Sequence, residues 1–147
     1  MFAQVALKLT GPVDHLRLVW QTGETLLASV VFDDDAEATR YHLLVALQEM
    51  VTNVLRHGYR LDDSRPIEVV FELHDEELCI NLRDQGPAFD PRRYDTSAVD
   101  NLEAMPTEAG GHGIRIVRQV MDKVDYERVD GWNELRMSKC VRVNANI

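Results

Sequence analysis

The sequence predicts a two-layer α/β sandwich, in which one mixed, mostly antiparallel sheet carries helices on one of its faces. Apolar residues alternate with polar ones over 5–9, 67–73 and 78–82, which is the period of half-buried strands. Over 43–55 they recur instead at steps of three and four, which is the period of an amphipathic helix. Short polar turns join two pairs of expected strands into hairpins, which makes most of the sheet antiparallel.

The composition is that of an ordinary globular protein. The chain has 147 residues, 45% hydrophobic and 28% charged, which suits one domain with a proper core. No apolar run approaches the roughly 20 residues that span a bilayer, and the first residues form no signal peptide, so we expect a cytoplasmic protein without membrane contact. The net charge of −9 argues against direct nucleic-acid binding and would suit a basic protein partner.

The first third of the chain predicts a strand and then a helix. The strand pattern over 5–9 ends at Gly11-Pro12, and a helical pattern follows from 13 to about 31. Gly23 weakens the middle of that helix by about 1 kcal/mol relative to Ala and allows a break there. The acidic run 33–35 is expected to begin the next helix, since aspartates favour helix N-termini; a metal site is the alternative.

The second expected helix, over about 36–56, carries two rows of side chains. Its apolar stripe is made of Leu43, Leu47, Met50, Val51, Val54 and Leu55. Beside it, Glu49, Asn53 and His57 are each four residues apart and therefore lie one above the other. Gly58 follows as the expected C-terminal cap.

This polar row suggests metal and proton chemistry. An asparagine carbonyl is a hard oxygen ligand suited to Mg²⁺, which keeps waters and substrate phosphates among its other ligands. A glutamate one turn earlier can act as a general base toward a water or a hydroxyl. The alternative is that Glu49 and Asn53 are only the solvated flank of the helix.

Two later segments have the composition of ligand-binding loops. The strand that ends at Asp84 runs into Gln85-Gly86-Pro87, a turn that often carries binding residues but is also common on its own. Residues 92–109 show no clear period, which is typical of a lid or an irregular loop, and they lead into the glycine-rich run 110–113. A glycine-rich turn before a helix leaves backbone N–H groups free for a phosphate. The apolar face of that helix is expected to be Ile114, Val117, Val120 and Met121.

The chain is expected to close with a hairpin of strands over 123–129 and 133–143, around the turn Asp130-Gly131. Cys79 and Cys140 fall in expected strands without the spacing of metal ligands. We therefore expect two buried free thiols.

In this order, the three motifs resemble the ATP site of the GHKL ATPase superfamily. The N box is matched by EMVTNVLRHGY, the G1 box by LRDQGPAFDP, and the G2 box by the run that begins GGHGIRIV. Within that superfamily, the chain resembles the anti-sigma factor serine/threonine kinases of the RsbW and SpoIIAB type, over roughly residues 40 to 140. The resemblance implies the GHKL (Bergerat) ATP-binding fold, a single histidine-kinase-like ATPase domain over residues 1–147, and binding of ATP with Mg²⁺.

The resemblance also implies a role for each matching residue. Glu49 would be the base that activates a serine or threonine hydroxyl of the protein substrate, and Asn53 would bind Mg²⁺. Asp84 would accept a hydrogen bond from the adenine amino group, and Gly86 would let the backbone approach the base. Asn133 stands where the family often has a threonine near the adenine-binding Asp.

Phosphate binding is assigned by the same resemblance to the glycine-rich turn. Gly111, His112, Gly113 and Ile114 would offer backbone N–H groups to the phosphates. His57 would either close the end of its helix or contact the nucleotide.

One departure concerns an arginine that the SpoIIAB type carries just before its glycine turn, where it can meet the terminal phosphate. Here Glu108-Ala109 occupy that place, and Arg92, Arg93 or Arg115 are the candidates to substitute. The departure bears on the kinase rate more than on ATP binding.

The implied function is an anti-sigma factor kinase. It would sequester an alternative sigma factor and phosphorylate a STAS-type anti-anti-sigma protein, whose new charge would release it. A homodimer is also implied, and Arg17 is a candidate partner contact, with a solvated surface arginine as the alternative. A second hypothesis is a nucleotide-binding module that switches partners without kinase activity, against which Glu49 argues. A third hypothesis is the catalytic domain of a histidine kinase. The sequence argues against it, because no long helix pair with a phosphoacceptor histidine precedes the motifs.

Overall fold

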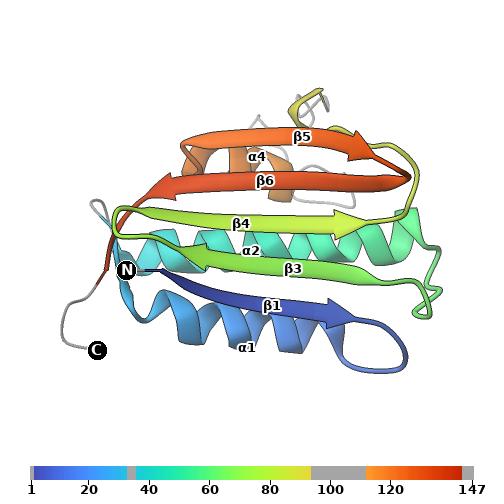
Figure 1. Cartoon of the computed structure of the whole chain (residues 1–147), viewed down its shortest axis with the longest axis horizontal. Helices are drawn as coiled ribbons and strands as arrows, with labels where there is room; N and C mark the ends of the chain where they lie inside the picture. The colour runs from blue at the N-terminus through green and yellow to red at the C-terminus, as the bar shows by residue number, and fades with distance from the viewer. Residues whose placement is uncertain (1, 33–35, 94–111, 144–147) are drawn as a thin grey trace, which may run out of the picture.

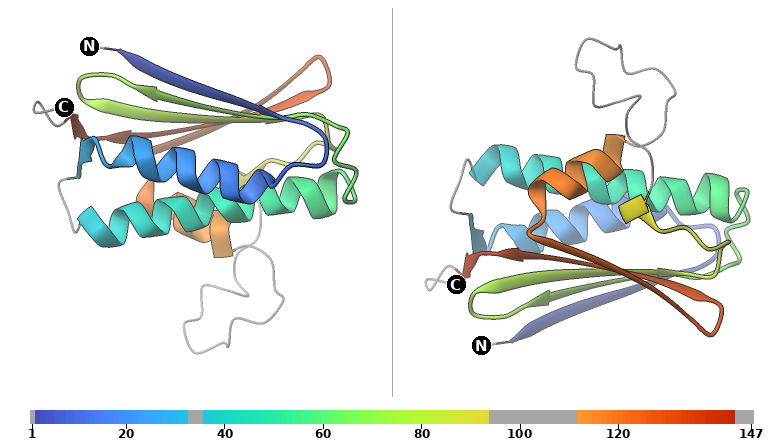
Figure 2. Two further views of the ribbon diagram at one scale, coloured as in Figure 1. Left: turned by 90° about the horizontal axis from the view of Figure 1, so that it is seen from below. Right: turned by 90° about the horizontal axis from the view of Figure 1, so that it is seen from above.

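The structure is a computed structural model that describes residues 2–32, 36–93 and 112–143. These residues form two layers, a five-stranded sheet and three α-helices that cover one face of this sheet (Figures 1 and 2). The predicted two-layer α/β sandwich is confirmed. The expected helix start at 33–35 and the expected lid from residue 94 onward lie outside the described residues.

The sheet has the spatial order β1 (Ala3–Leu9), β3 (Ile67–Leu73), β4 (Glu77–Asp84), β6 (Trp132–Cys140) and β5 (Lys123–Val129). Each pair of neighbours in it is antiparallel; hairpins join β3 to β4 and β5 to β6, whereas helical segments separate β1 from β3 and β4 from β6 in the chain. One row of facing residues crosses all five strands and consists of Val5, Phe71, Ile80, Met137 and Val124. Phe71 and Ile80 have no exposed surface, so this is the core face that the alternating pattern predicts.

α1 (His15–Leu27) is shorter than the helix predicted over 13–31. Arg40 donates hydrogen bonds from Nε to the carbonyl of Leu27 (3.1 Å) and from Nη2 to the carbonyl of Val30 (2.7 Å). These bonds satisfy carbonyl groups at and beyond the helix end, where the helix itself offers no partner. The predicted end of this helix is wrong. The side chain that binds the carbonyls at its end, Arg40, lies on the next helix, and a local sequence pattern does not reveal such a contact.

The residues after α1 form β2 (Val30–Val31), which pairs with β7 (Arg142–Val143) in a small second sheet. The strand predicted over 133–143 is therefore divided into β6 and β7, with the buried Val141 between them.

α2 (Ala36–Asn53) packs beside α1 at Gly23. A Cβ atom at Gly23 would lie 2.7 Å from Cδ2 of Leu44, on α2, and 3.6 Å from Cζ of Phe71. The break allowed there does not occur, because the missing side chain is what lets the two helices and the sheet come close.

α2 continues into a π-helical turn, η1 (Val54–Gly58), which ends with a bond from the Tyr59 N–H to the Val54 carbonyl (2.7 Å). The left-handed backbone that reverses the chain follows at Arg60 (φ 50°) and Leu61 (φ 65°). Gly58 is the last residue of the helical segment, as predicted, but the cap is Tyr59, so the prediction of Gly58 as the cap is wrong by one residue.

Tyr59 anchors this helix end to the sheet. Its hydroxyl donates to the carbonyl of Pro66 (2.5 Å) and accepts from the N–H of Gln85 (2.7 Å), just after β4. The Arg65 guanidinium lies over the ring at 4.5 Å from its centroid. Burial raises the pKa of the Tyr59 hydroxyl, so it remains a neutral donor.

α4 (His112–Val120) crosses α2 at a very short distance. A Cβ atom at Gly113 would lie 2.4 Å from Cβ of Glu49 and 3.3 Å from the carbonyl oxygen of Ala46. Ile114 and Val117 are buried on the inner face of α4, as the helical period predicts.

The two cysteines differ in exposure. Cys79 is buried, and burial raises the pKa of its thiol to about 11, whereas Cys140 is exposed, contrary to the prediction of two buried thiols. Among the described residues, no helix is long and apolar enough to cross a membrane.

The substitution Arg40→Met should lower the free energy of unfolding by about 2 kcal/mol, because it keeps the aliphatic stem but removes donors to two backbone carbonyls. Urea denaturation followed by circular dichroism measures this as a lower midpoint at unchanged slope. Arg56→Met, at an exposed arginine, is the matched control and should change stability by less than about 0.5 kcal/mol. Equal effects of the two substitutions would contradict the assigned role of Arg40.

Gly113→Ala should destabilise the protein by about 1–3 kcal/mol, because the new methyl group overlaps the side chain of Glu49. The sign of the change in unfolding free energy is informative, because the higher helix propensity of alanine alone would stabilise the protein by about 1 kcal/mol. Thermal unfolding of Gly113→Ala and of Gln119→Ala, at an exposed position of the same helix, separates the two effects. A more stable Gly113→Ala variant would show that α4 does not cross α2 this closely.

Candidate functional site

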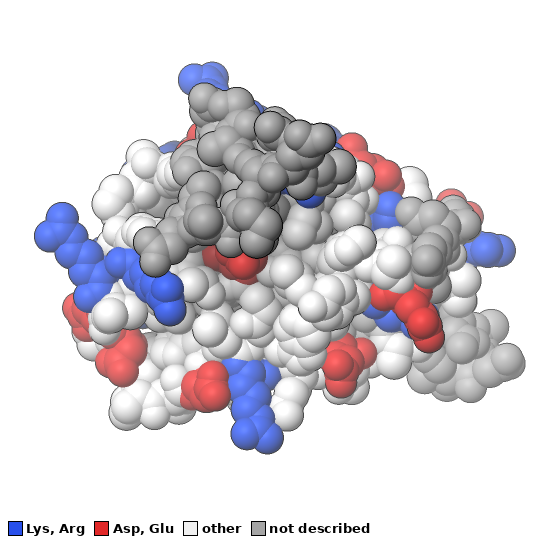
Figure 3. Space-filling model, turned by 180° about the vertical axis from the view of Figure 1, so that it is seen from behind, with Lys and Arg blue, Asp and Glu red and all other residues white. Residues whose placement is uncertain are grey.

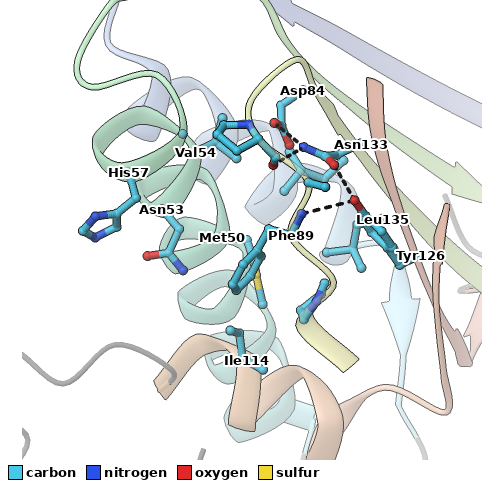
Figure 4. A pocket seen from close by; sticks show the side chains of 15 residues that line it. Met50, Asn53, Val54, His57, Asp84, Phe89, Ile114, Tyr126, Asn133 and Leu135 are labelled. Atoms are coloured by element: carbon cyan, nitrogen blue, oxygen red, sulfur yellow. Dashed lines mark hydrogen bonds between the residues drawn. The ribbon is translucent and has the colours of Figure 1, made fainter. Parts of the chain in front are cut away.

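A cavity of about 440 Å³ lies where the end of α2, the loop after β4, α4 and the β5–β6 hairpin meet (Figure 4). Its wall is mostly apolar with a few polar groups, which is typical of small-molecule sites. The lining residues are Met50, Asn53, Val54, His57, Gly58, Leu82, Asp84, Pro87, Ala88, Phe89, Pro91, Ile114, Tyr126, Asn133 and Leu135.

Asp84, the last residue of β4, presents a carboxylate to this cavity. The side chain is 8% exposed, and its Oδ1 accepts hydrogen bonds from the N–H of Gly86 (2.8 Å) and from Nδ2 of Asn133 (3.0 Å). Such donors stabilise a buried charge. Within the described part of the chain, Oδ2 has no hydrogen-bond partner, so the cavity contains one open acceptor.

Asn133, on β6, lies directly opposite Asp84 on β4, which agrees with the predicted proximity of these two residues. Its Nδ2 also donates to the carbonyls of Gly86 (3.2 Å) and Pro87 (3.0 Å). Its Oδ1 accepts from the hydroxyl of Tyr126 (2.5 Å) and from Nη1 of Arg128 (2.9 Å). Both ends of the amide are therefore engaged within the protein.

Tyr126 and Arg128 were not among the residues expected at the site. Their signal lies in the predicted hairpin: the turn Asp130-Gly131 sets Arg128 opposite Asn133 and Tyr126 opposite Leu135. A register argument from that turn would have found them.

Gly86 packs closely against Gly58, which lines the cavity. A Cβ atom at Gly86 would lie 3.0 Å from Oδ1 of Asp84 and 3.2 Å from Cα of Gly58. The space that a side chain would need at Gly86 is thus filled by the protein. Its role in backbone approach to a ligand stays a prediction.

Two members of the polar row on α2, Asn53 and His57, line the cavity. Glu49 is exposed beside the first turn of α4, and Asn53, one turn further, lines the cavity. His57 follows Asn53 in the π-helical turn and lines the same cavity. Its exposed imidazole lies on the side of the cavity away from Asp84 (Figure 4).

The N-terminus of α4 lies at the edge of the cavity, and Ile114 contributes to its wall. The backbone N–H groups of the first turn, at His112, Gly113 and Ile114, have no partner within the helix and carry the positive end of its dipole. This is suitable chemistry for an anion. Gly111 lies outside the described residues.

Two of the arginines that were candidates to meet a terminal phosphate are paired with a carboxylate. Arg92 forms a fork with Asp90, with Nε 3.0 Å from Oδ1 and Nη2 2.9 Å from Oδ2. This hydrogen bonding lowers the pKa of Asp90. Nε of Arg93 lies 3.7 Å from the same carboxylate, while Nε of Arg115 is buried without a hydrogen-bond partner among the described residues.

Comparisons with known proteins agree with this geometry. The sequence profile of the family described as the histidine kinase-like ATPase domain matches residues 11–139. The chain is 28% identical over 101 residues to the serine/threonine-protein kinase BtrW of Bordetella bronchiseptica, covering 67% of this chain and 69% of that protein. It is also 28% identical over 85 residues to the serine-protein kinase RsbW of Oceanobacillus iheyensis, covering 56% of this chain and 54% of that protein.

A solved structure, that of the RsbU and RsbW domains of Rv1364c from Mycobacterium tuberculosis, has the same fold. The TM-score is 0.62 at 17% sequence identity, and the match covers 95% of this chain and 33% of the other. The resemblance to the RsbW type that the three motifs carry is thus confirmed, and the chain belongs to the histidine kinase-like ATPase domain family.

Proposed function

We propose that this protein is an ATP-dependent serine/threonine protein kinase and anti-sigma factor. In this role it binds Mg-ATP, sequesters an alternative sigma factor and phosphorylates a STAS-type anti-anti-sigma protein. The observation that supports the proposal best is the open carboxylate oxygen of Asp84 in a mostly apolar cavity that is also lined by Asn53 and by Ile114, in the first turn of α4. The relatives named as serine-protein kinases support the kinase class.

The base of the nucleotide would bind at Asp84. Its Oδ2 would accept a hydrogen bond from the exocyclic amino group of adenine, and Oδ1 is already held by protein donors. Met50, Ile114 and Leu135 line the cavity and would cover the faces of a flat aromatic ring. One hydrogen bond and apolar contact on both faces suit adenine.

The phosphates would extend toward the start of α4 and the end of α2. Backbone N–H groups at residues 111–114 would donate to the phosphate oxygens. Asn53 would hold Mg²⁺ through its side-chain carbonyl, and the metal would neutralise the charge that develops on the phosphates. No group of three or more His, Cys, Asp and Glu side chains among the described residues is arranged to hold a metal, which suits an ion held largely by the phosphates.

Glu49 would act as the general base. The serine or threonine oxygen attacks the γ-phosphorus, the bond from that phosphorus to the β,γ-bridging oxygen breaks, and ADP leaves. The hydroxyl proton passes to the Glu49 carboxylate and then to solvent. Glu49 is exposed at the crossing of α2 and α4, where a protein substrate can approach it.

A partner would contact the helical face of the molecule. Acidic and basic side chains are interspersed over the described part of this face (Figure 3). Arg17 is exposed on α1 beside a shallow groove with Trp20 and Gln48, and it stays the candidate partner contact. A homodimer is part of the same proposal.

One observation favours a second function, a nucleotide-binding module that switches partners without phosphoryl transfer. The place of the family's arginine is taken by Glu108-Ala109, and Arg92 is already bound to Asp90. A nucleotide-dependent pull-down from the native lysate, with phosphosite mapping, separates the two functions. A captured antagonist carrying phosphoserine or phosphothreonine supports the kinase; nucleotide-dependent capture without any phosphosite supports the module.

Asn53→Ala should abolish the Mg²⁺-dependent part of ATP binding, because the variant lacks the oxygen that would hold the ion. Isothermal titration calorimetry with ATP, in Mg²⁺ and in EDTA, measures that part directly. The affinity without metal should stay within about twofold of the parent protein, since the base site is untouched. If Asn53→Ala kept the full gain from Mg²⁺, another residue would hold the metal.

Glu49→Gln should reduce phosphoryl transfer by about 10²–10⁴-fold while nucleotide affinity stays nearly unchanged. The substitution preserves the shape of the side chain against Gly113, so the packing of α4 is retained. Single-turnover transfer of ³²P to the captured antagonist gives the rate, and calorimetry gives the affinity. Transfer at the normal rate would remove Glu49 from the role of base.

A further inference from the structure

A hydrogen-bond chain runs from Tyr126, on the β5–β6 hairpin, to Asp84 at the end of β4, and the proposed reaction gives no role to Tyr126. The Tyr126 hydroxyl donates to Oδ1 of Asn133 (2.5 Å), and Nδ2 of Asn133 donates to Oδ1 of Asp84 (3.0 Å). The same hydroxyl accepts from the N–H of Phe89 (3.2 Å), in the loop after β4. All four residues line the cavity, and their bonds run along one side of it (Figure 4).

This chain defines the orientation of the Asn133 amide. Its oxygen receives two donors, the Tyr126 hydroxyl and Nη1 of Arg128 (2.9 Å). Its nitrogen faces three acceptors at 3.0–3.2 Å, namely the Asp84 carboxylate and the carbonyls of Gly86 and Pro87. A reversed amide would set oxygen against oxygen at all three contacts, so a donor always faces Asp84.

The fixed amide in turn limits the rotation of the Asp84 carboxylate. Oδ1 is held by Asn133 on one side and by the N–H of Gly86 (2.8 Å) on the other. Oδ2 is therefore a fixed acceptor rather than one that can turn toward different ligand atoms. A fixed acceptor binds an exocyclic amino group and repels a carbonyl oxygen in the same place, whereas a mobile carboxylate could turn to a ring N–H instead.

We propose that Tyr126 is a positioning residue for base selection. Through Asn133, its hydroxyl holds the Asp84 carboxylate in the orientation that accepts a 6-amino purine and rejects a 6-oxo purine. This inference rests on the proposed function, in which Asp84 meets the amino group of adenine. Tyr126 reaches that group through Asn133, so its effect falls on the preference between bases.

The test compares ADP with inosine diphosphate, which differs in carrying a 6-oxo group and a protonated ring nitrogen. Calorimetry on the full chain gives the ratio of the two dissociation constants. The parent protein should prefer ADP, and Tyr126→Phe should narrow that preference by about three- to tenfold. Arg128→Met, at an exposed position, removes the other donor to the Asn133 oxygen together with a donor to the carbonyl of Gly86 (2.9 Å), and it should narrow the preference in the same direction.

Tyr59→Phe is the matched control. It also removes a tyrosine hydroxyl that bonds to the turn after β4, at the N–H of Gln85, but that hydroxyl does not contact the chain from Tyr126 to Asp84. We expect a lower melting temperature and an unchanged ratio. Thermal unfolding of every variant identifies any that does not fold, and Arg128→Met then carries the test if Tyr126→Phe is such a variant.

Three outcomes would overturn the inference. If Tyr126→Phe weakens ADP and inosine diphosphate equally, Tyr126 is only structural. If the parent protein binds both equally, the carboxylate does not select the base, although nucleotide binding and the kinase proposal stand. If the parent protein binds neither diphosphate, the proposed function itself fails, and the inference fails with it.

Discussion

The contact between Gly58 and Gly86 sets where the functional site can form. Gly58 ends the π-helical turn after α2, and Gly86 follows the last residue of β4, so helix and strand meet backbone to backbone. A side chain at Gly86 would force its neighbours to shift, because its Cβ position lies 3.2 Å from Cα of Gly58 and 3.0 Å from Oδ1 of Asp84. The cavity opens beside this contact, with Asn53 on the helix and Asp84 on the strand facing the same space.

Much of the fold could be predicted because its signals are local. Alternation identifies the strands, and the turn Asp130-Gly131 has the positive φ values (51° and 83°) that such a residue pair favours in a hairpin. The end of α1 could not be predicted, since it depends on Arg40 from another helix. The π-helical turn also escaped prediction, because its bonds leave no pattern in the sequence.

The residues of the candidate site also fall into two groups, those that the sequence could predict and those that depend on tertiary structure. Asn53 and Asp84 lie on well-formed elements, and motif spacing brings both to the cavity. The turn Asp130-Gly131 indicates which residues face Asn133 across the strands, but the hydrogen bonds of Asn133 with Tyr126 and Arg128 became clear only from coordinates. The space around Gly113 and Gly86 is likewise a tertiary property, since each glycine faces a residue far away in the chain. Sequence reasoning therefore finds groups that touch a ligand more readily than groups that hold them in place.

The position of β6 between β4 and β5 has a consequence for folding. Asp84 and Asn133 are 49 residues apart in the chain, whereas the β3–β4 hairpin joins near neighbours. During synthesis that hairpin and the first two helices can form early, but the pocket has no second wall until the last strands insert beside β4. Contacts of such long sequence separation form slowly and raise the contact order of the fold. The nucleotide would thus meet a finished pocket only in the fully assembled domain, so its binding energy would be added to global stability rather than to any folding intermediate.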